Sequence, residues 1–282
     1  MTSGIDRREI VLFGDSLTQR GWGGEEASGV QGAGWASLIA AAYSRKADVV
    51  NRGFGGYTTR SGAAIADRVF QRGGAQQKLF SVVFFGANDV AQEAPQHVPV
   101  ADYERNLGAI VAAAAAASDA VLVVSPPPVD ESQWPDRSCA RLREYAAAAA
   151  RVAAAASCAG ACVVHVDLAP AFALRGAAAE AAGAAAPGWL TLLSDGLHLT
   201  PAGQAVVAEA VLAALFAAAP GSAPDSLPWD LPHWAKLPGD DAGVAAVLAP
   251  AAVAAMRAAP PLPMPNLICA APQPRAPGRE QT

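Results

Sequence analysis

The sequence predicts an α/β fold in which a five-stranded parallel sheet lies between two layers of helices. Short apolar runs alternate with longer helical patterns up to about residue 217, which is typical of βαβ units. The apolar runs are nearly continuous, as expected for strands that are buried on both faces. Each run is followed by turn-forming or polar residues. We therefore expect a three-layer α/β/α sandwich.

The strands and helices are predicted from these patterns in chain order. Strands are expected at 10–13, 48–51, 81–85, 120–125 and 162–167. Helices are expected at about 34–45, 59–69, 102–117, 137–158 and 201–217. The last helix has the clearest start, with Thr200 as N-cap and Pro201 at the first helical position. Alanine supplies helix propensity, so the periodic Leu, Val and Ile positions must form the stripes that face the sheet.

The composition changes after about residue 217, which divides the chain into a domain over 1–217 and an extension over 218–282. The extension is rich in Pro, Ala and Gly and has little periodicity. Its aromatic stretch at 227–237 is expected to pack against the domain. The remainder, above all 260–282, is expected to be disordered, because prolines remove backbone donors and few branched side chains are available to bury.

Charge and cysteine usage exclude several function classes. The formal net charge is −5 and the basic residues are scattered, so no nucleic-acid partner is expected. The cysteines show no CxxC pair and no histidines at zinc-finger spacing, so we interpret them as free thiols and expect no metal. They are Cys139, Cys158, Cys162 and Cys269.

The sequence also carries no pattern that predicts secretion or stable membrane insertion. The first ten residues lack an apolar stretch of signal-peptide length, and no segment offers ~18 consecutive strongly apolar residues. We expect a cytoplasmic protein. The sequence leaves the oligomeric state open.

Polar residues follow several of the predicted strands, where ligands bind in an open parallel sheet. The first strand leads into Gly14-Asp15-Ser16, where a glycine lets the chain turn and presents a serine hydroxyl. The second leads into a glycine-rich turn that contains Gly56, and the third into Gly86-Ala87-Asn88-Asp89. Each pattern alone is also an ordinary turn, so none of them decides the function by itself.

The segment Asp195-Gly196-Leu197-His198 precedes the last predicted helix and lies at the same edge of the sheet. An aspartate and a histidine three residues apart can meet in a turn. Such a pair suits a histidine that takes a proton from a serine and returns it to a leaving group, with the carboxylate orienting the ring. A capping turn is the simpler interpretation of this segment on its own.

The four motifs occur together in the order found in the SGNH (GDSL-type) hydrolase superfamily, which residues 9–217 resemble. Residues 52–60, 95–99 and 126–130 are similar to the isoamyl acetate-hydrolysing esterases in particular. The chain departs from that subgroup at 21–34, at 176–187 and after about residue 238, which leaves the shape of the substrate pocket open.

The resemblance implies a flavodoxin-like fold and a serine esterase that acts on short-chain carboxylic esters. Ser16 would be the nucleophile, His198 the base and Asp195 its partner, and no cofactor would be needed. The backbone N–H groups of Ser16 and Gly56 and the Asn88 amide would form the oxyanion hole. The residues expected to line the substrate site are Tyr57, Phe54 and Trp22. The expected partner is a small-molecule ester.

Other functions stay open on the sequence alone. Related families act on acetylated sugars, lysophospholipids or acyl thioesters with the same motifs. A flavodoxin-like domain could instead bind phosphate at Gly55-Gly56 without catalysis, although the GxGxxG pattern is missing and Asp195 and His198 would then have no role. The other histidines, His97, His165 and His233, are expected to be structural, and whether His97 borders the pocket is left open.

Overall fold

The computed structural model describes residues 7–25, 31–71, 77–185 and 187–258. The chain folds into two compact units, Met1–Pro224 and Asp225–Thr282. The first unit therefore extends beyond the boundary expected at residue 217. The additional residues include a 3₁₀ turn at Pro220–Ser222, where the buried Tyr43 hydroxyl donates to the Ser222 carbonyl at 2.7 Å.

The first unit is built on a five-stranded sheet in which every neighbouring pair of strands is parallel, in the order β4-β1-β5-β6-β7. Its strands are β1 (Arg8–Gly14), β4 (Ala47–Gly53), β5 (Phe80–Phe84), β6 (Val121–Val124) and β7 (Val163–Val166). Each coincides with a predicted strand to within a few residues. The predicted α/β sandwich is thus confirmed.

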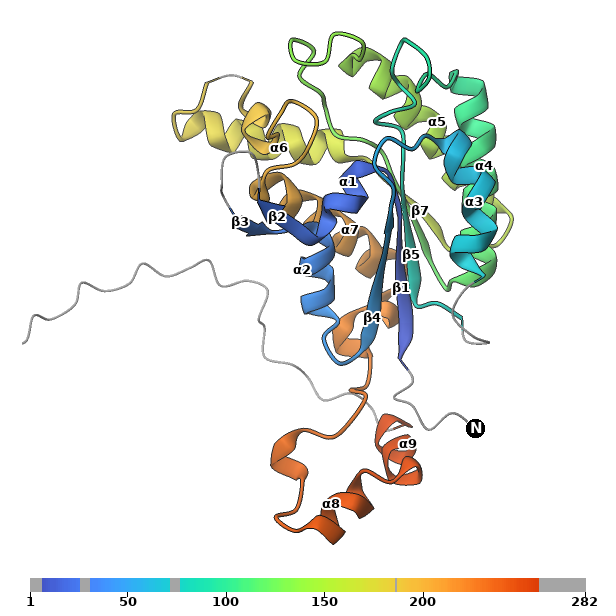
Figure 1. The fold of residues 1–282 in the computed structure, drawn as a ribbon, viewed down its shortest axis with the longest axis vertical. Helices are drawn as coiled ribbons and strands as arrows, with labels where there is room; N and C mark the ends of the chain where they lie inside the picture. The colour runs from blue at the N-terminus through green and yellow to red at the C-terminus, as the bar shows by residue number, and fades with distance from the viewer. Residues whose placement is uncertain (1–6, 26–30, 72–76, 186, 259–282) are drawn as a thin grey trace, which may run out of the picture. The chain divides into compact units, whose positions relative to one another are not determined.

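Helices cover both faces of this sheet (Figure 1). On one face lie α3 (Thr59–Phe70), α4 (Val100–Ala117) and α5 (Cys139–Cys158). On the other lie α2 (Trp35–Ala42), α6 (Leu168–Ala181) and α7 (Pro201–Ala218). Helix α7 starts as predicted, since Thr200 Oγ1 accepts from the Gly203 N–H and Pro201 is the first helical residue.

Within the described residues of the first unit, helices α1 (Ser16–Gln19) and α6 and the hairpin of β2 (Gly23–Glu25) and β3 (Gln31–Ala33) were not expected from the sequence. Helix α6 is alanine-rich and begins after the capping residue Asp167, but it has almost no apolar periodicity and was therefore missed. The short helix α1 is less than two turns long. The small antiparallel hairpin of β2 and β3 lies within the glycine-rich stretch after α1.

The extension differs in part from the expected disorder. In the second unit, helices α8 (Asp241–Val247) and α9 (Pro250–Ala258) occupy a stretch expected to be disordered. Asp240 caps α8 and alanine favours both helices, which explains why weak periodicity was a poor guide. Within the aromatic stretch, the rings of Trp229, His233 and Trp234 contact one another. The disorder expected for 260–282 concerns residues outside the described ones.

Helix α7 is long and apolar enough to cross a membrane by length and composition. Val206, Val207, Val211 and Leu215 are nevertheless buried within the first unit. The helix packs on the sheet and on α2 and α6. Its hydrophobicity is thereby accounted for by the core of the first unit.

Phe13 lies at the centre of an aromatic cluster in the core. Its ring is fully buried and packs edge-on against Phe54, Phe70 and Phe85, with centroid distances of 6.2, 5.7 and 4.9 Å. Phe13 also lies three residues before Ser16. The cluster therefore fixes the end of β1 that leads into the candidate site.

We expect Phe13→Ala to lower the free energy of unfolding by ~3–5 kcal/mol, because it removes a buried ring and leaves a cavity. Urea denaturation followed by circular dichroism measures this. Leu174→Ala is the control, since Leu174 is 77% exposed on α6 and its loss should change stability by less than about 0.5 kcal/mol. Equal stability losses for the two variants would contradict this account of the core.

Candidate active site at the carboxyl edge of the sheet

The candidate site lies at the carboxyl ends of β1, β4 and β5. Chain order reverses across β1, since β4 lies on one side of it and β5 on the other. Ligands bind at such a switch point in open α/β sheets. Gly14 ends β1 and pairs with Gly53 of β4 and Phe84 of β5. The segments that contain Ser16, Gly56 and Asn88 therefore start from adjacent strand ends.

The turn that carries Ser16 is anchored from several sides. Asp15 caps α1, with Oδ1 accepting from the Leu17 N–H at 2.9 Å. The Trp35 indole donates to the Leu17 carbonyl at 2.9 Å, and the Asn51 amide donates to the Thr18 carbonyl at 2.7 Å. These bonds hold Ser16 as the first residue of α1, where its N–H has no acceptor within the helix.

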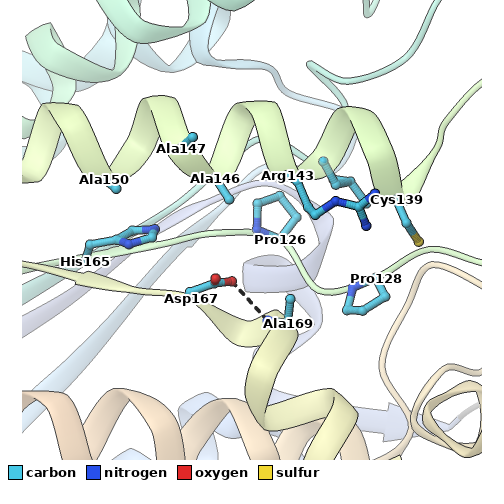
Figure 2. A pocket seen from close by; sticks show the side chains of 11 residues that line it. Pro126, Pro128, Cys139, Arg143, Ala146, Ala147, Ala150, His165, Asp167 and Ala169 are labelled. Atoms are coloured by element: carbon cyan, nitrogen blue, oxygen red, sulfur yellow. Dashed lines mark hydrogen bonds between the residues drawn. The ribbon is translucent and has the colours of Figure 1, made fainter.

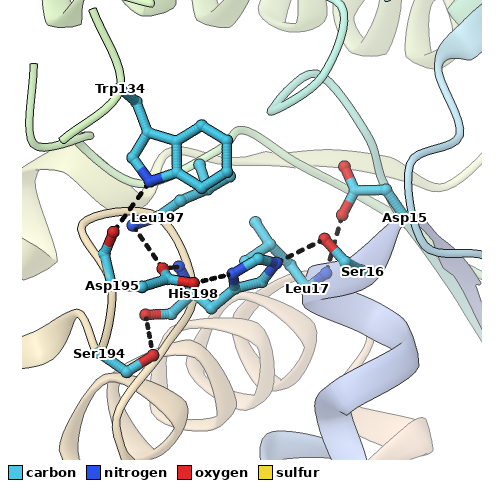
Figure 3. A network of polar contacts seen from close by, with 8 residues as sticks. All are labelled: Asp15, Ser16, Leu17, Trp134, Ser194, Asp195, Leu197 and His198. Atoms are coloured by element: carbon cyan, nitrogen blue, oxygen red, sulfur yellow. Dashed lines mark hydrogen bonds and ion pairs between the residues drawn. The ribbon is translucent and has the colours of Figure 1, made fainter. Parts of the chain in front are cut away.

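Ser16, His198 and Asp195 form a continuous relay (Figure 3). Ser16 Oγ lies 3.0 Å from His198 Nε2, and His198 Nδ1 lies 2.6 Å from Asp195 Oδ2. Ser16 and His198 are separated by 182 positions in the chain and meet only through the fold. The His198 side chain is 12% exposed and that of Asp195 45%, so the relay extends from the protein interior to solvent.

The segment 194–198 holds Asp195 and His198 in this arrangement. Asp195 Oδ1 accepts from the backbone N–H groups of Leu197 and His198 at 3.0 and 2.8 Å. The Ser194 N–H donates to the His198 carbonyl at 2.7 Å, which closes the turn. Burial raises the pKa of Asp195, but the hydrogen bonds from His198 and Leu197 outweigh it and leave that pKa below its ordinary value. Asp195 is therefore an anion positioned to orient the imidazole.

Gly56 and Asn88 come from the segments after β4 and β5, which meet where Asn88 contacts Tyr57, the residue after Gly56. Gly56 adopts a φ of +78°, a conformation that favours glycine, and among the described residues its N–H has no hydrogen-bond acceptor. Asn88 is buried, and its Nδ2 donates to the Tyr57 carbonyl at 2.9 Å. That bond uses one of the two amide hydrogens and orients the side chain, which leaves the second hydrogen for a ligand.

Three further residues, which the sequence did not single out, link these groups. The Trp134 indole donates to the Asp195 carbonyl at 2.9 Å (Figure 3). Gln96 Nε2 donates to the Gly56 carbonyl at 3.2 Å. Arg137 is buried between them and donates to Gln96 Oε1 at 2.9 Å. Trp134 lies in the 126–138 segment, which follows β6. The polar residues of that segment were the sequence signal that could have indicated these contacts.

The residues expected to line the substrate pocket are placed as follows. Phe54 and Tyr57 stack on each other with centroids 5.0 Å apart, in the turn that contains Gly56. Trp22 is 46% exposed and ends the 3₁₀ turn Arg20–Trp22 that follows α1. Their contact with substrate stays a prediction.

The other three histidines make local contacts. His97 Nδ1 lies 2.6 Å from the Ala91 carbonyl and so is held by its own loop. His165 Nε2 lies 2.6 Å from the buried Ser125 hydroxyl, and burial lowers the pKa of its imidazole. His233 Nδ1 accepts from the Ala235 N–H at 3.2 Å. Their expected structural roles stay a prediction.

A cavity of about 490 Å³ lies between α5 and the ends of β6 and β7 (Figure 2). Alanines of α5 and two prolines supply most of its apolar wall, while His165, Asp167 and Arg143 add polar groups. None of the relay residues lines it. Across the described residues, no three His, Cys, Asp or Glu side chains gather closely enough to hold a metal ion. Cys139, Cys158 and Cys162 are free thiols, and Cys269 lies outside the described residues.

Comparison with known proteins decides the family. The model of the GDSL-like lipase/acylhydrolase family matches residues 12–206, which is more than half of the chain. The chain belongs to this family. The resemblance inferred from the four motifs is thereby confirmed.

Relatives within the family share part of their length with this chain. A GDSL esterase/lipase of Arabidopsis thaliana is 45% identical over 109 residues, which cover 37% of this chain and 42% of the relative. The isoamyl acetate-hydrolyzing esterase 1 homolog of Mus musculus is 42% identical over 106 residues, covering 36% and 39%. The matched segments thus span less than half of either relative.

A solved structure shares the fold over a longer stretch. The lipase/acylhydrolase from Enterococcus faecalis superposes with a TM-score of 0.57 at 26% identity, covering 74% of this chain and 95% of that one. The agreement extends over most of the first unit. It supports the architecture that brings Ser16 and His198 together.

Two buried carboxyl groups, those of Asp15 and Asp89, lie near the turn that carries Ser16. Burial raises the pKa of Asp15 to about 7, and the neighbouring Asp89 carboxyl group adds to this effect, while the Leu17 N–H and Arg137 lower that pKa by smaller amounts. Burial also raises the pKa of Asp89 to about 6, against the hydrogen bonds that Thr59 donates to it. Oδ2 of each carboxyl group is buried and lacks a hydrogen-bond partner. Asp15 is therefore mostly protonated in the folded protein below neutral pH.

We expect Asp15 to make stability fall with rising pH. Its folded pKa of about 7 lies above the unfolded value of about 3.9, so its contribution is complete below pH ~4 and is lost as the pH rises through 7. Asp15→Asn keeps a capping oxygen but cannot ionise. Between pH 5 and pH 8, wild type should lose about 2 kcal/mol more unfolding free energy than Asp15→Asn.

Urea titrations at the two pH values test this expectation. Asp102→Asn is the control, because Asp102 lies on the surface of α4 in an ion pair with Arg105. The control should follow the wild-type pH dependence. If Asp15→Asn follows it as well, the buried carboxyl group does not titrate as described.

Proposed function

We propose that the protein is a serine esterase that hydrolyses short-chain carboxylic esters, with acetate esters as the preferred class. The observation that carries this proposal is the Ser16–His198–Asp195 relay, with distances of 3.0 and 2.6 Å. A histidine held between a serine hydroxyl and a carboxylate is the arrangement that activates serine for acyl transfer. The acetate preference rests on the printed name of the mouse relative.

The reaction proceeds in two halves through an acyl-enzyme intermediate. Ser16 Oγ attacks the ester carbonyl carbon while its proton passes to His198 Nε2. The tetrahedral intermediate then expels the alcohol, which takes that proton from Nε2, and the acyl group stays on Ser16. A water molecule, deprotonated by the same nitrogen, attacks the acyl carbon; the bond to Ser16 Oγ then breaks, Oγ takes the proton back from Nε2, and the acid is released. Asp195 holds the Nδ1–H and stabilises the charged imidazolium in both halves.

The negative charge of the tetrahedral intermediate falls on the former carbonyl oxygen. The Ser16 N–H, the Gly56 N–H and the free Asn88 amide hydrogen are the donors proposed to stabilise it. The fixed orientation of Asn88 by the Tyr57 carbonyl favours this role, because a preorganised donor needs no reorientation during the reaction. No metal or organic cofactor takes part in the proposed steps.

We expect Ser16→Ala to lower kcat for p-nitrophenyl acetate by at least about 10³, because it removes the nucleophile. Release of p-nitrophenolate measures turnover, and a series of acetate, butyrate and octanoate should show falling kcat/KM. Acid-quenched wild type should carry the acetyl group on the peptide containing Ser16. Ser157→Ala, at the end of α5, is the matched control and should keep wild-type turnover. Equal activity of both variants would disprove the assignment of Ser16.

We expect Asn88→Ala to lower kcat by about 10²–10³ while KM stays within about threefold, because the lost donor acts mainly on the developing oxyanion. The same ester assay measures both constants. Asn106→Ala on α4 provides the matched control. A rise in KM alone would mean that Asn88 binds the substrate and does not stabilise the oxyanion.

A further inference from the structure

Arg137 has a buried guanidinium group with hydrogen-bond acceptors on several sides. The residue is 3% exposed. Nε donates to the Ala87 carbonyl at 2.9 Å, and Nη2 donates to Gln96 Oε1 at 2.9 Å. Nη1 donates to both carboxylate oxygens of Asp136 at 2.7 and 2.8 Å, which balances the buried charge. The guanidinium also lies over the Trp134 ring, 4.8 Å from its centroid.

One side of this network leads to the proposed oxyanion donors. Gln96, fixed through its carbonyl oxygen by Arg137, donates its amide to the Gly56 carbonyl at 3.2 Å. The Ala87 carbonyl that Arg137 binds belongs to the residue directly before Asn88. Arg137 is thus linked to the Gly56 backbone through Gln96 and binds the peptide group that joins Ala87 to Asn88.

The other side leads to the segment that carries Asp195 and His198. Trp134, stacked under the guanidinium, donates its indole N–H to the Asp195 carbonyl at 2.9 Å. The Asp130 N–H, from the same segment after β6, donates to the Gly196 carbonyl at 2.8 Å. The segment 126–138 is therefore attached to the turn that holds the imidazole in place.

We propose that Arg137 is a positioning residue that sets the separation between the oxyanion donors and the Asp195–His198 turn. This inference rests on the proposed function for its catalytic consequence, although the contacts themselves do not. The oxyanion donors and the Asp195–His198 pair lie in different parts of the chain. If the Gly56 turn and the 194–198 turn are both connected to the same rigid side chain, their separation is fixed without any direct contact between them. Arg137 touches neither substrate nor the reacting atoms in this account.

An arginine is required for this role because its planar fork donates in three directions while its face stacks on an aromatic ring. A lysine keeps the charge but is a single point donor on a flexible stem, so it cannot hold Ala87, Gln96 and Asp136 at once. A displacement of about 1 Å between donor and reacting atom can cost about 10² in rate. The effect of losing Arg137 should accordingly appear in kcat.

The first test compares Arg137→Lys with Arg151→Lys, a matched change of an exposed arginine on α5 that pairs with Glu104. We expect Arg137→Lys to lower kcat for p-nitrophenyl acetate by at least about tenfold with KM within about twofold. Arg151→Lys should leave both constants unchanged. A wild-type kcat for Arg137→Lys, or a rise in KM alone, would overturn the proposal.

A double-mutant cycle separates positioning from a general loss of stability. If Arg137 acts by positioning Asn88, introducing Arg137→Lys into Asn88→Ala should lower kcat less than it does in wild type. If Arg137 only supports the fold, the two effects should multiply. Multiplication would overturn the proposal. Trp134→Phe and Gln96→Ala test each side of the network separately with changes that spare the buried charge, and a wild-type kcat for both variants would also overturn it.

A spectroscopic measurement keeps the test independent of turnover. In the wild type, the hydrogen bond between His198 Nδ1 and Asp195 should give a downfield proton resonance, and Arg137→Lys and Trp134→Phe should shift or broaden it. Arg151→Lys should not. If the wild type hydrolyses none of the esters, the proposed function fails and this resonance alone decides the positioning role. An unchanged resonance in both variants would overturn it.

Discussion

The close packing of β1 against its two neighbours at Gly14 sets the position of the rest of the site. A Cβ atom at residue 14 would lie 2.3 Å from the Phe84 carbonyl oxygen and 2.2 Å from Thr18 Oγ1, so only glycine fits there. This contact lets the chain leave β1 and enter α1 directly against the end of β5. Ser16 is thereby held between the segments that supply Gly56 and Asn88, at the point where the strand order reverses.

Next to this edge of the sheet, the protein buries three ionisable side chains, which an apolar core does not normally contain. Asp15 and Asp89 are buried with one oxygen each unpartnered, and Arg137 is buried with its donors occupied. Desolvation of such groups is costly unless they are neutral or paired. The raised pKa values of the two carboxyl groups and the ion pair of Arg137 with Asp136 show how that cost is limited.

Asp195, His198 and the proposed oxyanion donor Gly56 lie in turns, yet each turn is fixed by more than its own hydrogen bonds. The 194–198 turn is closed by its own hydrogen bonds and is bound from outside by Trp134 and Asp130. The Gly56 turn is bound by Gln96. Catalytic groups on loops need such support, because sub-ångström placement decides how well they stabilise a transition state.

The sequence by itself determined the five strands, the helices α2, α3, α4, α5 and α7, and the four motifs that contain Ser16, Gly56, Asn88 and Asp195 with His198. These features are encoded locally, in runs of apolar residues, in capping residues and in short spacings. Tertiary structure alone decided that Ser16 meets His198 across 182 positions, and that Arg137, Gln96 and Trp134 join the two sides of the site. Their side-chain hydrogen bonds to one another and to the Gly56 and Asp195 turns span 40 to 61 positions, so only the folded sheet edge brings these groups together.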